Sequence, residues 1–371
     1  MEAKRMSASV KDRSESRTGS QLREGNVVAV DLFCGAGGLT HGLLDVGVSV
    51  VAGYDIDEAC RHPFEHNNPP ARFIGRSVSA LKGEELARLY PPNSWRVLVG
   101  CAPCQPFSRY TQGSSAASDE KWGLLSHFGR LAEESMPDVV SMENVPELER
   151  HSVYDEFVCL LSRLGYHVSP HKVYCPDYGI PQHRTRLVLF ASRLGPIRII
   201  PPTHQPKRYM TVRRAIGNLK KIDAGGIYSR DPLHRTSRLS DTNRTRIRHS
   251  KPGGSWRDWP DELIAKCHRK KKGRTYPSVY GRMRWDEPSP TITTQFYGFG
   301  NGRFGHPEQN RAISLREGAI LQTFPRDYEF VKPGDEYRFK VIGRLIGNAV
   351  PVRLGEVVGK TIKLHLSQHG K

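Results

Sequence analysis

Two cysteines that follow an apolar stretch are the residues of this chain best suited to nucleophilic chemistry. Cys101 and Cys104 lie in the segment GCAPCQPFS, residues 100–108, directly after a predicted buried strand at 96–100. C-x-x-C spacing also occurs in zinc sites, but such a site needs about four ligands, and neither a second C-x-x-C nor a paired histidine cluster follows. We therefore interpret Cys104 as a single nucleophilic thiol on a loop, with a thioredoxin-like pair as the alternative. Residues 110–120 are mostly small and polar, as expected for a mobile lid.

An acid and two arginines stand at the ends of two further predicted strands. Glu143 follows the strand expected at 138–142. Parallel α/β sheets bind their ligands at the carboxyl ends of the strands, so this acid and the loop at 104 should face the same crevice. Arg184 and Arg186 lead into the strand expected at 187–190, and their spacing of two places both on one side of it. Taken alone, two such arginines at a sheet edge are more often solvated than functional.

A glycine-rich turn joins the first predicted strand to the first predicted helix. Residues 31–38 read DLFCGAGG, and glycines at such a junction let the backbone turn tightly and approach a ligand closely. The spacing departs from G-x-G-x-x-G, because Gly38 directly follows Gly37 and position 40 is threonine. The turn is therefore less suited to a pyrophosphate than to a phosphate-free ligand such as S-adenosylmethionine. Asp55, twenty residues after Gly35, can accept hydrogen bonds from both ribose hydroxyls; the alternative is a structural turn beside a solvated aspartate.

Short apolar strands alternate with helical patterns over the first half of the chain. We expect a first helix near 39–46 and strands at 27–33, 48–54, 96–100, 138–142 and 187–190. This alternation predicts an α/β fold in which helices cover both faces of a parallel sheet.

Changes in composition divide the chain into four segments. Residues 1–25 form a polar tail that lacks an apolar signal core, and we expect this tail to be disordered. Residues 26–194 are the expected α/β domain, residues 195–335 a smaller irregular domain, and residues 336–371 a segment that returns to the first domain. The stretch 201–275 could in isolation be a disordered linker, but Trp256 and Trp259 give it something to bury.

The chain carries a large excess of positive charge. Its 371 residues include 56 Lys and Arg against 38 Asp and Glu, a formal charge of +18, and residues 201–275 hold 20 basic against 6 acidic residues, a net +14. Because the excess is concentrated in one segment, we interpret it as a face for nucleic acid rather than as a generally basic surface. No apolar run approaches ~18 residues, so we expect no membrane span. Seven scattered cysteines fit free thiols in a reducing compartment.

Six motifs occur in an order and spacing that resemble the DNA cytosine-5 methyltransferase family. They are DLFCGAGG at 31–38, PCQ with a following serine at 103–108, ENV at 143–145, QHRTR at 182–186, the pair RE through FP at 316–325, and GNAVP at 347–351. Together they cover nearly the whole chain beyond residue 26. The resemblance implies a Rossmann-like S-adenosylmethionine-dependent methyltransferase sheet with helices on both faces. It also implies that residues 26–194 form the catalytic and cofactor-binding domain and residues 195–335 a target-recognition domain that binds DNA.

The resemblance assigns a mechanism to the nucleophile and its neighbours. Cys104 would attack carbon 6 of a cytosine extruded from the duplex, which makes carbon 5 nucleophilic enough to take the methyl group. Glu143 would hydrogen-bond ring nitrogen 3 and the exocyclic amine of the base. Arg184 and Arg186 would hold the cytosine carbonyl and Glu143 in place.

The resemblance also predicts which residues contact the cofactor and the substrate. For S-adenosylmethionine they are Phe33, Gly35, Gly37, Gly38, Asp55, Ile56, Ser77, Val78, Pro103 and Asn348. For the DNA substrate they are Gln105, Ser108, Asn144 and Gln182. The family usually has an acid after the third strand for the adenine amine, whereas this chain has Ser77, which hydrogen-bonds more weakly than a carboxylate. No metal is expected.

Three alternatives stand beside a DNA methyltransferase. A tRNA cytosine-5 methyltransferase would share these motifs but would not need so large a basic segment. A non-catalytic DNA-binding regulator would not need Cys104, Glu143 and both arginines intact, and a dinucleotide oxidoreductase would need a different glycine spacing. We expect a monomeric enzyme in the bacterial cytoplasm that acts on double-stranded DNA, as the modification half of a restriction-modification system with a cognate restriction endonuclease.

Overall fold

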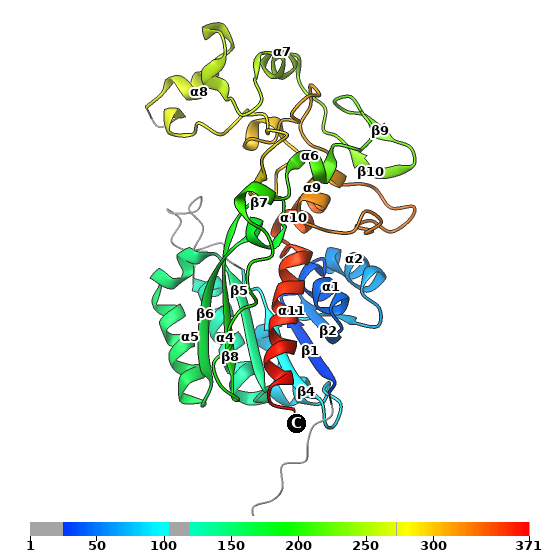
Figure 1. The fold of residues 1–371 in the computed structure, drawn as a ribbon. Helices are drawn as coiled ribbons and strands as arrows, with labels where there is room; N and C mark the ends of the chain where they lie inside the picture. The colour runs from blue at the N-terminus through cyan, green and yellow to red at the C-terminus, as the bar shows by residue number, and fades with distance from the viewer. Residues whose placement is uncertain (1–24, 104–118, 272, 371) are drawn as a thin grey trace, which may run out of the picture.

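The chain forms a large sheet-containing part and a smaller irregular part that lies beyond the carboxyl ends of the parallel strands (Figure 1). The computed structural model describes residues 25–103, 119–271 and 273–370. Among these residues, no helix combines the length and the apolar composition that crossing a bilayer requires.

A mixed seven-stranded sheet, in the order β3-β2-β1-β4-β5-β8-β6, forms the larger part. Its strands are β1 (Val27–Leu32), β2 (Ser49–Asp55), β3 (Arg72–Gly75), β4 (Trp95–Gly100), β5 (Val139–Asn144), β6 (His167–Tyr174) and β8 (Thr185–Ser192). The first five are parallel, as predicted, but the expectation of a wholly parallel sheet is wrong at one edge, because β8 is antiparallel to both β5 and β6. The segment 175–184 between β6 and β8 is too short for the crossover that parallel neighbours need.

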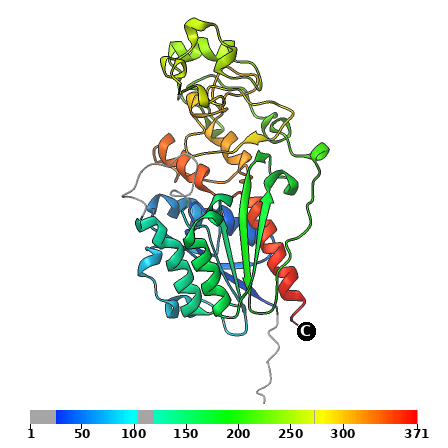
Figure 2. The same cartoon turned by 90° about the vertical axis from the view of Figure 1, so that its left-hand side faces the viewer.

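Successive side chains of the central strands pack in two cores on opposite faces of the sheet. Ala29 of β1 belongs to the core that α1 (Gly38–Asp45), α2 (Arg61–Asn67) and α11 (Val352–Ser367) cover. Val30, the next residue, belongs to the core under α3 (Gly83–Ala87), α4 (Asp119–Ser135) and α5 (Ser152–Arg163). Figure 2 shows the red helix α11 on one side of the strands and the teal and green helices on the other. The expected helices on both faces are thus confirmed, and β1 is buried along its whole length.

The smaller part contains short elements joined by long irregular segments. Besides 3₁₀ turns, the remaining helices and strands of the described residues are β7 (Gln182–His183), β9 (Ile227–Tyr228), β10 (Asp231–Arg235), β11 (Ser289–Pro290), α6 (Val212–Ile216), α7 (Asp241–His249), α8 (Lys266–Arg269), α9 (Leu315–Leu321) and α10 (Phe339–Asn348). A third core between residues 239 and 312 buries Trp256 and Trp259. This core favours a folded segment over a disordered linker at 201–275.

The division of the chain at 195 and 336 remains a proposal, because contacts with the sheet extend past the first of these positions. The backbone N–H of Ile197 donates to Ser169 Oγ of β6 (3.1 Å), and that of Thr203 donates to the Asp177 carbonyl (2.9 Å). Before the second position, Ile292 and Phe296 already belong to the core that α11 covers. The segment that leaves the sheet part altogether is therefore shorter than 195–335.

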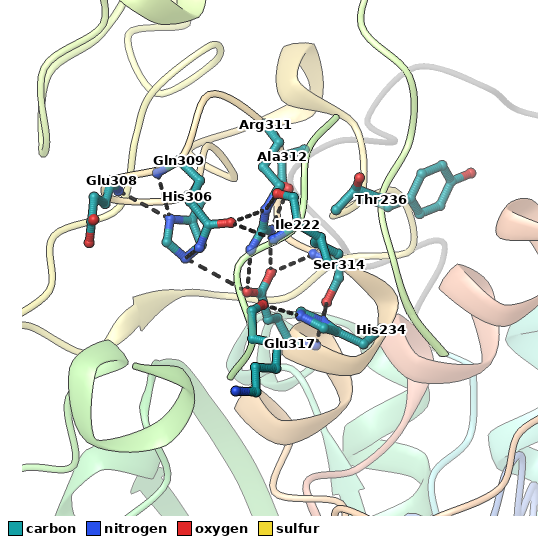
Figure 3. Close-up of polar contacts among 12 residues, drawn as sticks. Ile222, His234, Thr236, His306, Glu308, Gln309, Arg311, Ala312, Ser314 and Glu317 are labelled. Carbon is teal, nitrogen blue, oxygen red and sulfur yellow. Dashed lines mark hydrogen bonds and ion pairs between the residues drawn. The ribbon is translucent and has the colours of Figure 1, made fainter. Parts of the chain in front are cut away.

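A buried ion-pair network fixes the segments around α9 (Figure 3). Arg311 is fully buried and donates to both carboxylate oxygens of Glu317 (2.7 and 2.8 Å), while Ser314 at the helix N-cap donates its backbone N–H to the same acid (2.6 Å). Burial alone would raise the pKa of Glu317, but the Arg311 charge lowers this pKa to about 2. His306 Nε2 lies 3.7 Å from the same carboxylate, and its Nδ1 accepts from the backbone N–H groups of residues 308 and 309. Burial lowers the pKa of His306 to about 4, so its ring is neutral at physiological pH.

Candidate active site

A cavity of about 990 Å³ opens at the carboxyl ends of β1, β2, β4 and β5. Twelve of the predicted site residues line it: Phe33, Gly35, Asp55, Ile56, Ser77, Val78, Pro103, Glu143, Asn144, Arg184, Arg186 and Asn348. Three others, Cys104, Gln105 and Ser108, lie outside the described residues. The remaining three, Gly37, Gly38 and Gln182, are not among the lining residues. The strand ends therefore bring together residues from all six motifs except the pair RE through FP.

The glycine turn divides into a cavity-facing half and a packing half. Gly35 lines the cavity with φ +52°, and Phe33 beside it adopts φ 60°, a backbone conformation that costs a phenylalanine energy and tends to occur at functional sites. Gly37 and Gly38 instead face protein. A Cβ on Gly37 would lie 2.5 Å from Asn68 Nδ2, and one on Gly38 would overlap the Val350 carbonyl oxygen. These two glycines allow close packing against distant segments, so in this structure they support the turn from behind.

Two aspartates meet the cavity beside this turn. Asp55 accepts from the backbone N–H groups of Gly35 and Asp57 (both 2.9 Å), and burial raises the pKa of its carboxyl group. Asp31 is buried at the end of β1, where Oδ2 accepts from the Thr40 hydroxyl (2.7 Å). Its Oδ1 is buried and has no hydrogen-bond partner among the described residues, and burial raises the pKa of Asp31 to about 7. We assigned no role to Asp31 from the sequence, although a carboxylate in an otherwise apolar strand is a signal for one.

The serine that stands in place of the family's acid is engaged locally. Ser77 lies in the cavity wall as the N-cap of the 3₁₀ turn Val78–Ala80. Its Oγ accepts from the Ser79 backbone N–H (3.3 Å) and lies 2.7 Å from Ser79 Oγ. Val78 is buried next to it. Ser77 thus keeps part of its hydrogen-bonding capacity for a ligand.

The carboxylate of Glu143 is buried and held from two sides. It is 3 % exposed, Oε2 accepts from Cys101 Sγ (2.7 Å), and Oε1 lies 3.0 Å from Arg186 Nε. Oε1 has no hydrogen-bond partner among the described residues, although Arg186 lies so near. The contact with Arg186 is therefore an ion pair in which the N–H is not aligned for a hydrogen bond. Cys101 therefore has a direct contact with the acid, a contact that the C-x-x-C spacing did not reveal.

Arg184 is buried and Arg186 is half-buried, so neither is a solvated residue at the sheet edge. Arg184 is 5 % exposed, and the side chain of Arg186 is 13 % exposed. Arg186 pairs with Glu143, whereas Arg184 Nε has no hydrogen-bond partner within the described segments. Burial and then repulsion from Arg186 lower the pKa of Arg184 to about 10, so it remains a cation at neutral pH. A buried donor without a partner costs free energy, so its retention in a residue that lines the cavity indicates a role for Arg184 there.

Asn144 and Gln182 make protein contacts with both ends of their side chains. Asn144 Nδ2 donates to the Ala102 carbonyl (3.1 Å), and its Oδ1 accepts from the Val145 backbone (2.8 Å), which ties the end of β5 to the cysteine loop. Gln182 is fully buried, donates to Gln322 Oε1 (2.9 Å) and accepts from the Ile292 backbone N–H (2.8 Å). These contacts indicate that both side chains hold the backbone around the site in place.

Asn348 reaches the cavity from the far end of the chain. It is the last residue of α10, next to Gly347, where a Cβ would overlap the Thr293 backbone. The absence of a side chain at 347 lets the end of α10 approach this segment. At the same rim, Arg344 of α10 forms an ion pair with Asp57 (2.6 Å).

A sheet of this topology with a glycine turn, a buried acid and two arginines around one cavity defines a class of methyltransferase. The model for C-5 cytosine-specific DNA methylases matches residues 27–364, and the chain belongs to this family. It is a DNA (cytosine-5)-methyltransferase, and enzymes of this family use S-adenosylmethionine.

Several relatives are similar over most of their length. The type II methylase M.HgiDII of Herpetosiphon aurantiacus is 57% identical over 340 residues, which cover 91% of this chain and 95% of the relative. The type II methyltransferase M.Eco47II of Escherichia coli is 31% identical and aligns over 92% of this chain and 80% of its own. Among solved structures, the Dnmt2 methyltransferase of S. pombe has a TM-score of 0.56 at 15% identity, with 93% of this chain and 99% of that chain covered. At this identity the likeness concerns the fold alone.

Proposed function

We propose that this chain transfers a methyl group from S-adenosylmethionine to carbon 5 of a cytosine flipped out of double-stranded DNA, through a covalent bond to Cys104. The arrangement of Glu143 carries this proposal. Its carboxylate is buried at the cavity and held between Cys101 and Arg186. Glu143 lies near the end of β5, and β5 pairs with β4, the strand that leads into the Cys104 loop. An acid fixed in this way can act on a base attacked from the neighbouring loop.

The described part of the cavity fits S-adenosylmethionine. Its volume lies in the range of small-molecule sites. Asp55 would accept from the ribose hydroxyls, and Val78 and Ile56 offer apolar surface for the adenine. The unpartnered Oδ1 of Asp31 would face the positively charged methionine part. When bound, the cofactor supplies a methyl group made electrophilic by the adjacent sulfonium.

The reaction on the base would proceed by addition and elimination. The Cys104 thiolate adds to carbon 6 while Glu143, protonated when the base is bound, gives its proton to ring nitrogen 3, which leaves an electron-rich carbon 5. Carbon 5 would take the methyl group as the bond between the methyl carbon and the cofactor sulfur breaks, with S-adenosylhomocysteine as the leaving group. A base then removes the proton from carbon 5, the carbon 5–carbon 6 double bond forms again, and the Cys104 sulfur leaves as a thiolate. The proton on nitrogen 3 returns to Glu143.

Arg184 and Arg186 would divide the positioning between them. Arg186 is already paired with Glu143, so it would hold the acid in place. Arg184 has an unpartnered Nε at the cavity, so it would donate to the cytosine carbonyl oxygen and help to stabilise the adduct. The family resemblance gave both roles to the pair, and the two environments support one role for each residue.

We further propose that the enzyme is a type II modification methyltransferase that acts on duplex DNA as a monomer in a bacterial cytoplasm. The likeness to M.HgiDII, described as a type II methylase, supports this biological role and with it a cognate endonuclease. The net +14 of residues 201–275 supports a face for the DNA backbone.

A mechanism-based trap tests the proposed chemistry. Duplex DNA from a randomised pool, with 5-fluorocytosine in place of cytosine, should bind the enzyme covalently in the presence of cofactor, because fluorine cannot leave carbon 5 as a proton does. Cys104→Ala should abolish trapping. Cys101→Ala, the matched control, should still trap, although more slowly, because Glu143 loses one contact. Trapping that survives Cys104→Ala would remove the covalent mechanism, and trapping by tRNA but not by any duplex would overturn the DNA assignment.

A further inference from the structure

Two histidines and a glutamate from distant parts of the chain converge on the outer side of α2. His62 and His66 are four residues apart on this helix, so they lie on one face of it. Glu329 follows α9 by eight residues. One oxygen of its carboxylate, Oε2, lies 3.6 Å from His62 Nε2 and 3.4 Å from His66 Nε2. The two imidazole rings are stacked with centroids 5.2 Å apart.

The backbone of Glu329 is held against α2 from both sides. Asn67 Nδ2 donates to the Glu329 carbonyl oxygen, and the Glu329 N–H donates to Asn67 Oδ1, both at 2.9 Å. The neighbouring residues Tyr328 and Phe330 are buried in the core under α2. These two hydrogen bonds fix the main chain at 329, which places the side chain of Glu329 within reach of both histidines.

The polar atoms of this cluster lack good hydrogen bonds to one another. Contacts of 3.4 and 3.6 Å are longer than the usual 2.7–3.2 Å of an N–H···O bond. His62 Nε2 is buried and has no hydrogen-bond partner in the described part of the chain. A single carboxylate oxygen thus faces two imidazole nitrogens without bonding well to either.

We propose that His62, His66 and Glu329 bind one divalent transition-metal ion of the zinc type. The three ligand atoms lie within 4.8 Å of one another. With metal–ligand bonds of about 2.0–2.1 Å, adjacent ligand atoms of a tetrahedral site lie ~3.4 Å apart, which matches both contacts of Glu329. Only the two histidine nitrogens have to approach each other, and the side chain of His66 is 51% exposed and free to adjust.

The chemistry of the donor set selects the class of ion. Two imidazole nitrogens and one carboxylate suit zinc, nickel, cobalt or copper, whereas magnesium and calcium prefer oxygen ligands alone. The positive charge of Lys332 lies near the site and opposes a cation there, but the Glu329 carboxylate offsets that charge. Water can complete the coordination, because Glu329 and His66 are partly exposed.

Such an ion would strengthen the support of the glycine turn. Tyr328, next to Glu329, donates its hydroxyl to the Ala36 carbonyl oxygen (2.5 Å), and Asn68 at the end of α2 donates to the Tyr328 hydroxyl (3.2 Å). The metal would join the same two segments, α2 and residues 328–330, in addition to the hydrogen bonds of Asn67 and Asn68. Its role is therefore structural, and the site is separate from the cavity that holds Glu143.

Cobalt titration of the untagged, metal-stripped full-length enzyme tests the proposal. Co²⁺ in a site of nitrogen and oxygen ligands gives visible d–d absorption, and cysteine ligation would add a thiolate charge-transfer band in the near ultraviolet. We expect one equivalent of Co²⁺ to bind without that band, to be displaced by Zn²⁺, and to raise the melting temperature. His66→Ala and Glu329→Gln should each weaken binding by about 10-fold or more. His167→Ala, at an exposed histidine of β6, is the matched control and should bind as the wild type does.

The outcomes separate a metal site from a simple cluster of ionisable groups. Both variants should melt close to the wild type without metal, since His66 and Glu329 are partly exposed, and only the wild type and the control should gain stability from Co²⁺. Three results would overturn the proposal: no binding at millimolar Co²⁺, binding that both variants retain, or a spectrum dominated by thiolate ligation.

Discussion

Removal of the buried charge at Glu317 should destabilise the enzyme strongly, although this residue touches neither the cavity nor the proposed metal site. In Glu317→Gln, Arg311 stays buried without the carboxylate that receives two of its hydrogen bonds. Breaking a buried ion pair from one side costs about 3–5 kcal/mol. The pKa of Glu317 gives a similar figure, because lowering it from 4.5 to about 2 corresponds to about 3 kcal/mol of stability at neutral pH.

The sign of the pH dependence follows from the depressed pKa. The stabilisation by Glu317 is fully present above its unfolded pKa of 4.5 and is lost as the pH falls through about 2. His306 behaves differently, because its folded pKa of about 4 lies below its unfolded value of 6.5. The unfolded chain therefore takes up a proton first, and stability declines as the pH falls from 6.5 to 4. Between pH 7 and 8 neither group titrates in the folded enzyme, and His306 of the unfolded chain titrates alike in both enzymes. The difference between wild type and Glu317→Gln should therefore be constant there.

Urea unfolding at pH 7 and pH 8, followed by tryptophan fluorescence, measures this difference. Trp285 packs against His306 with ring centroids 5.1 Å apart and reports on the network. Glu308→Gln is the control, because it removes an exposed ion pair with Lys221 (2.7 Å), and such pairs contribute little. A Glu317→Gln enzyme within ~1 kcal/mol of the wild type would refute the reasoning. So would a difference between the two enzymes that changes markedly from pH 7 to pH 8.

Two further predictions concern ligands. Ser77→Asp should tighten binding of S-adenosylhomocysteine by up to ~1–2 kcal/mol if a charge-assisted hydrogen bond to the adenine amine forms. The turn should keep its fold, because aspartate also serves as an N-cap at this position. Calorimetry would show unchanged or weaker binding if the adenine does not reach residue 77. Affinity for duplex DNA should fall steeply with salt, with a log–log slope of about −0.9 per phosphate neutralised, while cofactor affinity changes little; equal slopes for the two ligands in a salt titration would contradict a phosphate-binding role for residues 201–275.

The sequence predicted which residues meet at the cavity because many of them lie at or near strand ends. Glu143 lies near the end of β5, and Arg186, near the start of β8, contacts it. The family resemblance predicted this meeting, whereas the local pattern alone favoured two solvated arginines. The antiparallel edge was missed because apolar runs do not show strand direction. β6 was missed as a strand because most of its residues are only partly buried, and an edge strand of mixed composition has no clear apolar alternation.

Long-range packing is what local patterns could not reveal. Gly38 looks like a ligand-binding glycine from its place in the turn, yet the contact that excludes a side chain there comes from Val350, more than three hundred residues away. The environment of Asp31 also depends on long-range packing. Its position in the strand is visible in the sequence, but only the fold shows that one of its oxygens is buried without a hydrogen-bond partner among the described residues.

These long-range contacts explain why the chain must return to the sheet after residue 335. The glycine turn is supported by Val350 behind Gly38 and by Tyr328, which donates to Ala36. Asn348 reaches the cavity from the same end of the chain. The cavity that we propose to hold the cofactor is thus lined and supported by segments from both sides of the irregular region, and the turn at 35–38 cannot be fully packed until the end of the chain is in place. Residues 201–275, which we propose to bind DNA, lie in sequence between these two sets of segments.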